Sequence, residues 1–431
     1  MSEAAPLTAA TGATPSRLKS LAPLVLRYAF NTMGPVSIAG AHFLSALLFL
    51  HFLPQAEFGL FSFAFIVVPF ALSMTGALFG AALVTSANGK EPMTREALAA
   101  YVKASLVFAL VAGLVIFGLM IAGTAGPALA VVLALYGALM TQRWFGRCHA
   151  YALHQMPRAI TSDFIYSGVL VGGLLFLIAT GHLTPVTAGL TLVLCSGAAL
   201  LGFGRDFLQL QAAALREGSL RAFLPIWRDL ARWSLLGVVS TEFTANAHAY
   251  LVTLISGPRA FALIAAGSLF MRPVSLVMTA LPDAERAVMA RAMGAGKFAH
   301  AKRAVLNFRI ASLTVLAGTS ILAAIIMIWF PELILKRGYD ETSIVAVICI
   351  WVAVNAVRSL RTPESVLLQA AGEFKPLANA SVRSSVVSLA ATSALLSAFG
   401  PIVSLFGVLI GDLVMTERIF ALGRKWRAAH V

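Results

Sequence analysis

Long runs of apolar residues alternate with short polar turns along the whole chain. Each run is about 20 residues or longer, the length at which a helix crosses the hydrocarbon core of a bilayer. Transmembrane barrels need ten-residue strands of alternating polarity instead, and this chain does not show that alternation. The pattern predicts an all-α integral membrane protein with about twelve transmembrane helices, at 28–53, 58–87, 103–123, 126–147, 159–180, 183–204, 233–256, 259–282, 306–330, 342–362, 376–398 and 401–422.

The composition supports this reading. The 431 residues are 59% hydrophobic and only 12% charged, with a mean hydropathy of +0.87. A water-soluble domain cannot hide so many apolar side chains in its core. The first apolar run is too long for a signal peptide, and the polar segment before it has no hydrophobic region of its own, so we expect the N-terminus to stay uncleaved.

Basic residues give the chain an orientation. The formal net charge is +14, and nearly all Lys and Arg residues fall at the termini or in the connections on one side of the predicted helices. The opposite side holds Arg259, Lys336 and Arg337, and Arg272 lies within a helix. By the positive-inside rule, we expect both termini to be cytoplasmic. The charge therefore reflects membrane topology and contact with anionic lipid, and we expect no nucleic-acid partner.

The chain divides near its middle. The segment 212–232 interleaves aromatic and aliphatic residues with arginines, as in Trp227-Arg228, which is typical of a helix lying on a membrane surface. We predict five parts: an N-terminal tail (1–20), a six-helix half (21–211), this amphipathic linker (212–232), a second six-helix half (233–422) and a basic tail (423–431).

The two predicted halves repeat one another. Three short patterns recur in the same order, namely Phe58-Gly59-Leu60 with Phe261-Ala262-Leu263, residues 39–42 with 245–248, and Arg143 and Arg147 with Arg358 and Arg361. Six helices per half give both copies the same orientation, so a pseudo-two-fold axis runs along the membrane normal. Several transporters that rock around a central site are built in this way.

Three stretches also resemble a known family. These are FLPQAEFGLFSFAF at 52–65, GPRAFALIAAGSLFMRP at 257–273 and LLQAAGEFKP at 367–376. They are similar to the polysaccharide transporter and O-antigen flippase branch of the multidrug/oligosaccharidyl-lipid/polysaccharide (MOP) exporter superfamily.

The resemblance implies a V-shaped bundle of twelve helices that needs no cofactor. Its substrate would be an undecaprenyl-pyrophosphate-linked oligosaccharide, moved from the inner to the outer leaflet of a bacterial cytoplasmic membrane for the synthesis of exopolysaccharide, O-antigen or capsule. Membrane lipids, a polysaccharide polymerase and glycosyltransferases would be its partners.

An ionisable side chain at membrane depth is a functional candidate. Arg272 follows Arg259 by thirteen residues, which places it roughly 20 Å along the eighth helix, and Pro273 is expected to kink the helix there. A guanidinium holds two phosphate oxygens in a bidentate fork. We expect Arg272 to bind pyrophosphate in a cavity between the halves, and further substrate-binding candidates are Arg27, Asn31, Arg232 and Arg358.

Two acids and two histidines are candidates for ion coupling or for structural pairing. Glu242 lies in the seventh helix and either faces a cavity or pairs with an arginine such as Arg272. Asp412 in the twelfth helix is expected to pair or to cap a helix. His42 and His248 occupy matching positions of the repeat, which favours a packing or cavity-facing role over proton coupling.

The sequence is also compatible with two other functions. A small-molecule or drug exporter of the same superfamily would have acids and aromatic residues in its cavity. A membrane-embedded glycosyl polymerase or ligase would have clustered carboxylates and a large outer loop, whereas the predicted outer connections are short. Catalytic motifs such as GxSxG and HExxH are absent from the sequence, so we expect a protein that is not an enzyme.

Overall fold

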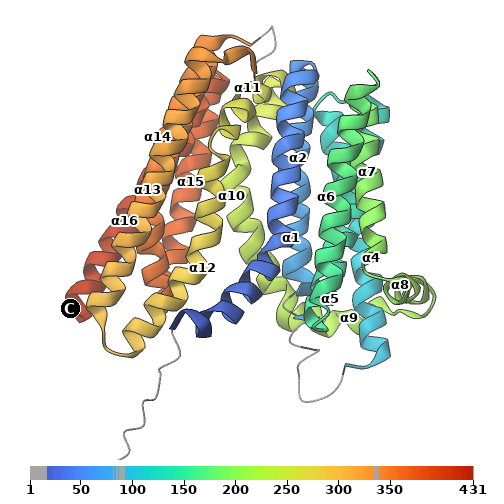
Figure 1. Cartoon of the computed structure of the whole chain (residues 1–431), viewed down its shortest axis with the longest axis horizontal. Helices are drawn as coiled ribbons and strands as arrows, with labels where there is room; N and C mark the ends of the chain where they lie inside the picture. The colour runs from blue at the N-terminus through green and yellow to red at the C-terminus, as the bar shows by residue number, and fades with distance from the viewer. Residues whose placement is uncertain (1–16, 81, 84–85, 87–92, 334–338, 431) are drawn as a thin grey trace, which may run out of the picture.

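The computed structural model is a bundle of long helices (Figure 1). It describes residues 17–430 apart from 81, 84–85, 87–92 and 334–338, and it describes side chains from residue 33 onward with scattered omissions. The predicted N-terminal tail thus lies largely outside the described residues. The first half contains α1 (Arg17–Phe52), α2 (Gln55–Thr75) with a π-helical turn (Gly76–Gly80), α4 (Arg95–Ala122), α5 (Pro127–Ala152), α6 (Met156–Ala179) and α7 (Pro185–Leu201).

The second half also has helices at its six predicted spans. Two short helices and a π-helical turn connect the halves: α8 (Arg205–Glu217), α9 (Leu220–Ile226) and η2 (Trp227–Ala231). The second half contains α10 (Arg232–Ser256), α11 (Pro258–Leu269), α12 (Arg272–Gly294), α13 (Phe298–Trp329), a 3-10 turn (Pro331–Leu333), α14 (Glu341–Ala370), α15 (Phe374–Phe399) and α16 (Pro401–His430).

Within the described residues, each of the twelve predicted spans lies mainly on a helix. Within the described part of the chain, eight helices are long and apolar enough to cross a membrane, and two bent pairs raise this number to ten. Helices α10 and α16 occupy the two other predicted spans and contain more polar residues, among them Glu242 and Asp412. The predicted all-α membrane bundle is confirmed.

The eighth span is broken where a kink was predicted. Helix α11 ends at Leu269, α12 begins at Arg272, and the two are bent by 66°. Pro273 stands in the first turn of α12, where its missing N–H costs no hydrogen bond and its fixed φ suits a helix start. The break leaves Arg272 as the first residue of a new helix in the interior of the bundle.

The connection between the halves begins earlier than predicted. A bend of 101° at Phe203-Gly204 separates α7 from α8, and Gly204 adopts a φ of +91°, which an L-residue rarely tolerates. Helix α8 therefore leaves the direction of the bundle and lies beside α4 at the outer edge of the first half (Figure 1). The connecting segment spans 205–231 in the structure, rather than 212–232.

The C-terminal boundary was also predicted too early. Helix α16 continues to His430 instead of ending at 422. Arg427 holds these last turns on the bundle through an ion pair with Glu364 of α14 at 2.7 Å, and Trp426 packs beside the apolar cluster that contains Phe308 and Val366. Residues 423–430 are therefore part of the last helix rather than a separate tail.

The two halves meet at one end of the bundle, which we call the closed end. It carries the α1–α2, α10–α11 and α15–α16 turns. There α2 packs against α11, and a side chain on Gly59 would overlap the main-chain carbonyl of Pro258. Toward the opposite end, which carries most of the basic residues and is called the basic end, the halves diverge (Figure 1).

Candidate functional site

A cavity of about 440 Å³ lies between the two halves. Helices α1, α2 and α5 of the first half and the start of α12 of the second half line it. Aromatic and aliphatic side chains supply much of the wall, and the basic side chains in it are three arginines and a histidine. The residues that define its character are His42, Phe43, Phe65, Trp144, Arg143, Arg147 and Arg272.

Arg272 is the cavity residue contributed by the break in the eighth span. Its backbone begins α12, so the partial positive charge of a helix N-terminus adds to that of the guanidinium. The alternative in which Glu242 neutralises it is wrong. The Glu242 carboxylate instead accepts hydrogen bonds from Ser73 at 3.0 Å and Asn246 at 3.2 Å. Arg272 forms no ion pair with a described residue, so its full charge faces the cavity.

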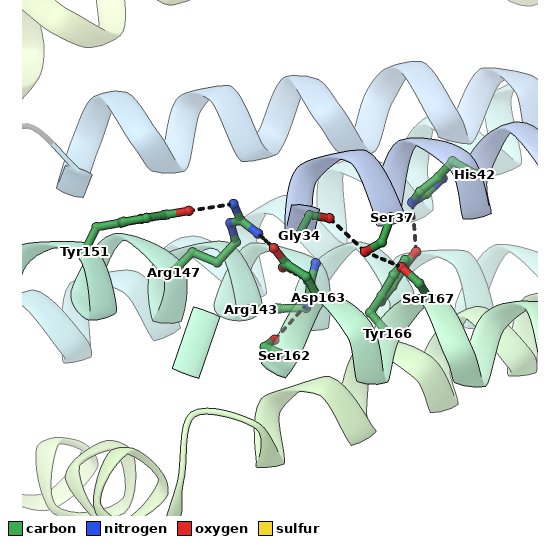
Figure 2. A network of polar contacts seen from close by, with 10 residues as sticks. All are labelled: Gly34, Ser37, His42, Arg143, Arg147, Tyr151, Ser162, Asp163, Tyr166 and Ser167. Atoms are coloured by element: carbon green, nitrogen blue, oxygen red, sulfur yellow. Dashed lines mark hydrogen bonds and ion pairs between the residues drawn. The ribbon is translucent and has the colours of Figure 1, made fainter. Parts of the chain in front are cut away.

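The other two cavity arginines share one buried carboxylate (Figure 2). Asp163 of α6 is buried and forms ion pairs with both Arg143 and Arg147 of α5. Arg143 also donates from Nε to Ser162 at 3.2 Å, and Arg147 donates to the Tyr151 hydroxyl at 3.2 Å. Two cations and one carboxylate leave this cluster with one surplus positive charge.

One nitrogen of the cluster has no partner. Nη1 of Arg143 is buried and makes no hydrogen bond with any described residue, although its residue lines the cavity. An unsatisfied buried donor on a charged group costs about 1–3 kcal/mol or more.

His42 belongs to the same network. Its Nε2 lies 3.0 Å from the hydroxyl of Tyr166, and that hydroxyl lies 3.3 Å from the hydroxyl of Tyr136. The Tyr166 ring lies under the guanidinium of Arg143, 4.7 Å from its central carbon. Helices α1, α5 and α6 are therefore joined by one continuous set of polar and cation–π contacts (Figure 2).

Arg358 does not lie in the cavity wall, which corrects its assignment as a substrate-binding residue. Its Nε donates to Asp412 of α16 at 2.8 Å, and Arg361 donates to the other carboxylate oxygen at 2.8 Å. Asp412 is buried and needs cationic partners, and α14 supplies them because it packs along α16. The expected pairing of Asp412 is thus present, eleven residues after the start of its helix.

Two further candidates, Arg232 and His248, lie outside the cavity wall. Arg232 is exposed at the start of α10 and is not among the residues of the cavity wall. His248 is buried with its ring 5.6 Å from that of Trp351, so of the two matched histidines only His42 faces the cavity. The side chains of Arg27 and Asn31 lie outside the described residues.

Sequence reasoning missed the cluster around Asp163. A short turn at 153–155 joins α5 to α6, so residues equally far from this turn lie at equal depth on neighbouring helices. Arg147 precedes the turn and Asp163 follows it by similar distances. That spacing was the signal that a buried ion pair connects the two helices.

A smaller apolar cavity of about 140 Å³ adjoins the central one. Phe43 of α1 and Pro273 of α12 line both cavities. Its other residues include Leu269, Thr319 and Leu322, and Leu322 is 53% exposed on the outside of the bundle. The smaller cavity is therefore separated from the central one by Phe43 and Pro273, and it lies beside α13 toward the bilayer side.

Comparison with solved structures identifies the architecture. No family model and no curated protein matches the chain. A multidrug resistance MATE family transporter of the MOP superfamily in its inward-facing conformation matches with a TM-score of 0.68 and 16% identity, over 93% of this chain and 95% of that one. The lipid II flippase MurJ in an inward closed conformation matches with a TM-score of 0.68 and 12% identity, over 91% and 87%. This chain has the fold of MOP-superfamily transporters.

The structure resembles an inward-facing transporter of this superfamily more than an outward-facing one. An outward-facing MATE transporter of this superfamily matches with a lower TM-score of 0.54, at 17% identity over 93% of this chain and 94% of that one. The contact of α2 with α11 at the closed end agrees with this difference. The MOP fold is thus present here in an arrangement that resembles the inward-facing one.

Proposed function

We propose that the chain is an alternating-access flippase that moves a lipid-linked, undecaprenyl-pyrophosphate-bound oligosaccharide across the bacterial cytoplasmic membrane. The observation that carries the proposal is the group of three arginines, Arg143, Arg147 and Arg272, on the wall of the central cavity. With Asp163 as their one carboxylate partner among the described residues, they leave surplus positive charge. A pyrophosphate matches this charge and the fork geometry of guanidinium groups.

The apolar cavity beside the site supports a lipid substrate. A polyprenyl chain that displaced Phe43 would enter this apolar cavity, beside Pro273 and Leu322, while its headgroup stayed in the central cavity. The positive-inside rule assigns the basic end to the cytoplasm, so the halves diverge toward the leaflet where a lipid-linked precursor would be loaded. Polysaccharide synthesis would be the process served.

A small-molecule exporter is the second candidate. The aromatic side chains Phe43, Phe65 and Trp144 in the wall suit a flat organic molecule, and two of the structural neighbours are multidrug resistance transporters. The surplus positive charge disfavours an organic cation, since like charges repel strongly in a site of low dielectric constant. An exporter of this kind would therefore prefer anionic or neutral molecules.

Transport by the purified protein tests the proposal. Proteoliposomes would hold a fluorescent undecaprenyl-pyrophosphate oligosaccharide, and a membrane-impermeant quencher would report its movement between leaflets. We expect the Arg272→Ala variant to lose about 10- to 100-fold in rate, the range of one charged hydrogen bond, and the Arg272→Lys variant to recover part of it. Arg303→Ala, at an exposed position of α13, is the matched control and should transport normally.

Three outcomes would overturn the proposal. Wild-type vesicles that fail to flip the lipid but accumulate a fluorescent organic anion would establish the exporter instead. An equal loss of transport rate in the Arg272→Ala and Arg303→Ala variants would show that Arg272 has no specific role in transport. A change in the covalent structure of the oligosaccharide during the assay would point to a glycosyl polymerase or ligase.

A further inference from the structure

A second basic hollow lies far from the central cavity. It has a volume of about 670 Å³ and is lined by the first part of α15 and the last part of α16, at the basic end of the bundle. Its wall carries Arg383, Arg418, Arg424 and Lys425 together with Asn379, and no carboxylate is among its lining residues. We call this hollow the α15–α16 groove.

The charge of the groove is not neutralised within the described protein. All four basic residues are exposed, and no described acid forms an ion pair with them. Other basic residues nearby behave differently, because Arg427 of the same helix is paired with Glu364. Four converging cations without a counterion form a site for a polyanion or a phosphate group.

The surface above the groove is apolar. One turn beyond Arg383 along α15, Val386 is 63% exposed, and two turns before Arg418 along α16, Ile410 is 40% exposed. Residues three, four or eight apart lie on the same helix face, so these side chains continue the two walls of the groove toward the middle of the bilayer. Phosphate-binding cations therefore adjoin a surface that suits hydrocarbon chains.

We infer that the α15–α16 groove binds an anionic phospholipid of the cytoplasmic leaflet, with its phosphate among the arginines and its acyl chains along Val386 and Ile410. Basic pockets between transmembrane helices on the cytoplasmic side hold anionic headgroups in this way. A soluble phosphate would leave the apolar surface unused. The transported substrate is a poorer fit, since the groove and the central cavity have no lining residue in common.

Lipid retention by the full-length purified protein tests this inference. Delipidated protein in detergent would be titrated with dioleoylphosphatidylglycerol or dioleoylphosphatidylcholine, and bound lipid counted by native mass spectrometry. We expect selective retention of phosphatidylglycerol. The double variant Arg383→Gln/Arg418→Gln should weaken it about 30-fold, because each basic residue near the surface contributes roughly fivefold.

Matched variants separate the groove from general surface charge. Lys302→Gln/Arg303→Gln removes two exposed charges from α13 at the same end and should retain the lipid as wild type does. Arg383→Lys/Arg418→Lys keeps the charge and should retain most of it. Equal weakening in the α13 variant would overturn the inference, as would displacement of the lipid by millimolar inorganic phosphate or a preference for undecaprenyl pyrophosphate over phosphatidylglycerol.

Discussion

Gly59 of α2 and Ala262 of α11 occupy equivalent positions of the sequence repeat, and in the structure they lie against one another. A Cβ atom on Gly59 would stand 3.2 Å from the Cβ of Ala262 and 2.6 Å from the carbonyl carbon of Pro258. Residues related by a two-fold axis meet only near that axis. The repeated corner of the sequence thus forms the contact between the halves at the closed end.

Adding one methyl group at this contact should open the closed end. Gly59→Ala places its Cβ against main-chain atoms of α11 that cannot rotate away, so we expect a cost of about 1–3 kcal/mol in the contacting state. His182 and Phe399 are exposed at the closed end, one in each half. Spin labels at these two positions would show a longer label-to-label distance by electron paramagnetic resonance. Gly118→Ala, where the new Cβ meets open space, is the control, and an unchanged distance in both variants would contradict the prediction.

A pair of glycines on α1 tests the packing around Asp163. A Cβ on Gly34 would overlap the Asp163 carboxylate and lie 3.1 Å from its carboxyl carbon, whereas a Cβ on Gly40 meets nothing. Alanine favours a helix over glycine by up to about 1 kcal/mol. We therefore expect Gly40→Ala to keep or raise the melting temperature of the purified protein and Gly34→Ala to lower it. The reverse order would show that α1 does not pack on Asp163.

Removing the charge of Asp163 should destabilise the first half severely. Asp163→Asn leaves Arg143 and Arg147 buried without their counterion, and breaking a buried pair in this way costs about 3–5 kcal/mol. Asp206→Asn removes an acid that is 80% exposed and pairs with Arg158 at 3.2 Å, so it should cost less than about 1 kcal/mol. Thermal unfolding in detergent compares the two, and similar melting temperatures would rule out a structural role for Asp163.

Arg358 and Arg272 should have separable effects on transport. Because Arg358 is bound to Asp412 away from the cavity, Arg358→Gln should lower stability by roughly 1–2 kcal/mol, between the exposed and buried limits. Its apparent KM for the transported lipid should stay at the wild-type value. Arg272→Gln should instead raise that KM with little change in melting temperature. A raised KM in the Arg358 variant would contradict this prediction and indicate that Arg358 binds the substrate.

The sequence predicted the helices well because apolar length and turn chemistry are local properties. The twelve spans, the break near Pro273 and the short corner before Phe58 follow from residues close together in the chain. The boundaries at 212 and 422 were placed wrongly, since they depend on Gly204 turning the chain and on Arg427 reaching Glu364 of another helix. Contacts of that kind are not visible in local composition.

Only part of the site was predicted, because contacts between helices are not visible in the local sequence. Depth in the membrane marked Arg272 as a candidate, and the structure places it in the cavity wall. Depth does not give the rotation of a helix or its neighbours, so Arg358 was assigned to the cavity although α16 presents Asp412 to it. The repeated arginine pair binds an aspartate of α6 in the first half and an aspartate of α16 in the second, a difference that sequence symmetry could not reveal.

The surplus charge of the central cavity has an electrical consequence. Arg143, Arg147 and Arg272 against Asp163 leave two positive charges, which a bound pyrophosphate would largely cancel. The resting potential of a bacterial membrane, negative inside, acts on net charge at about 2.3 kcal/mol per charge per 100 mV. For the proposed flippase, this potential would therefore favour the state whose cavity communicates with the cytoplasm when the protein is empty. It would have little effect on the equilibrium between the two states when the substrate is bound. In the proposed flippase, voltage would therefore favour the return of the unloaded protein and give the proposed transport a direction.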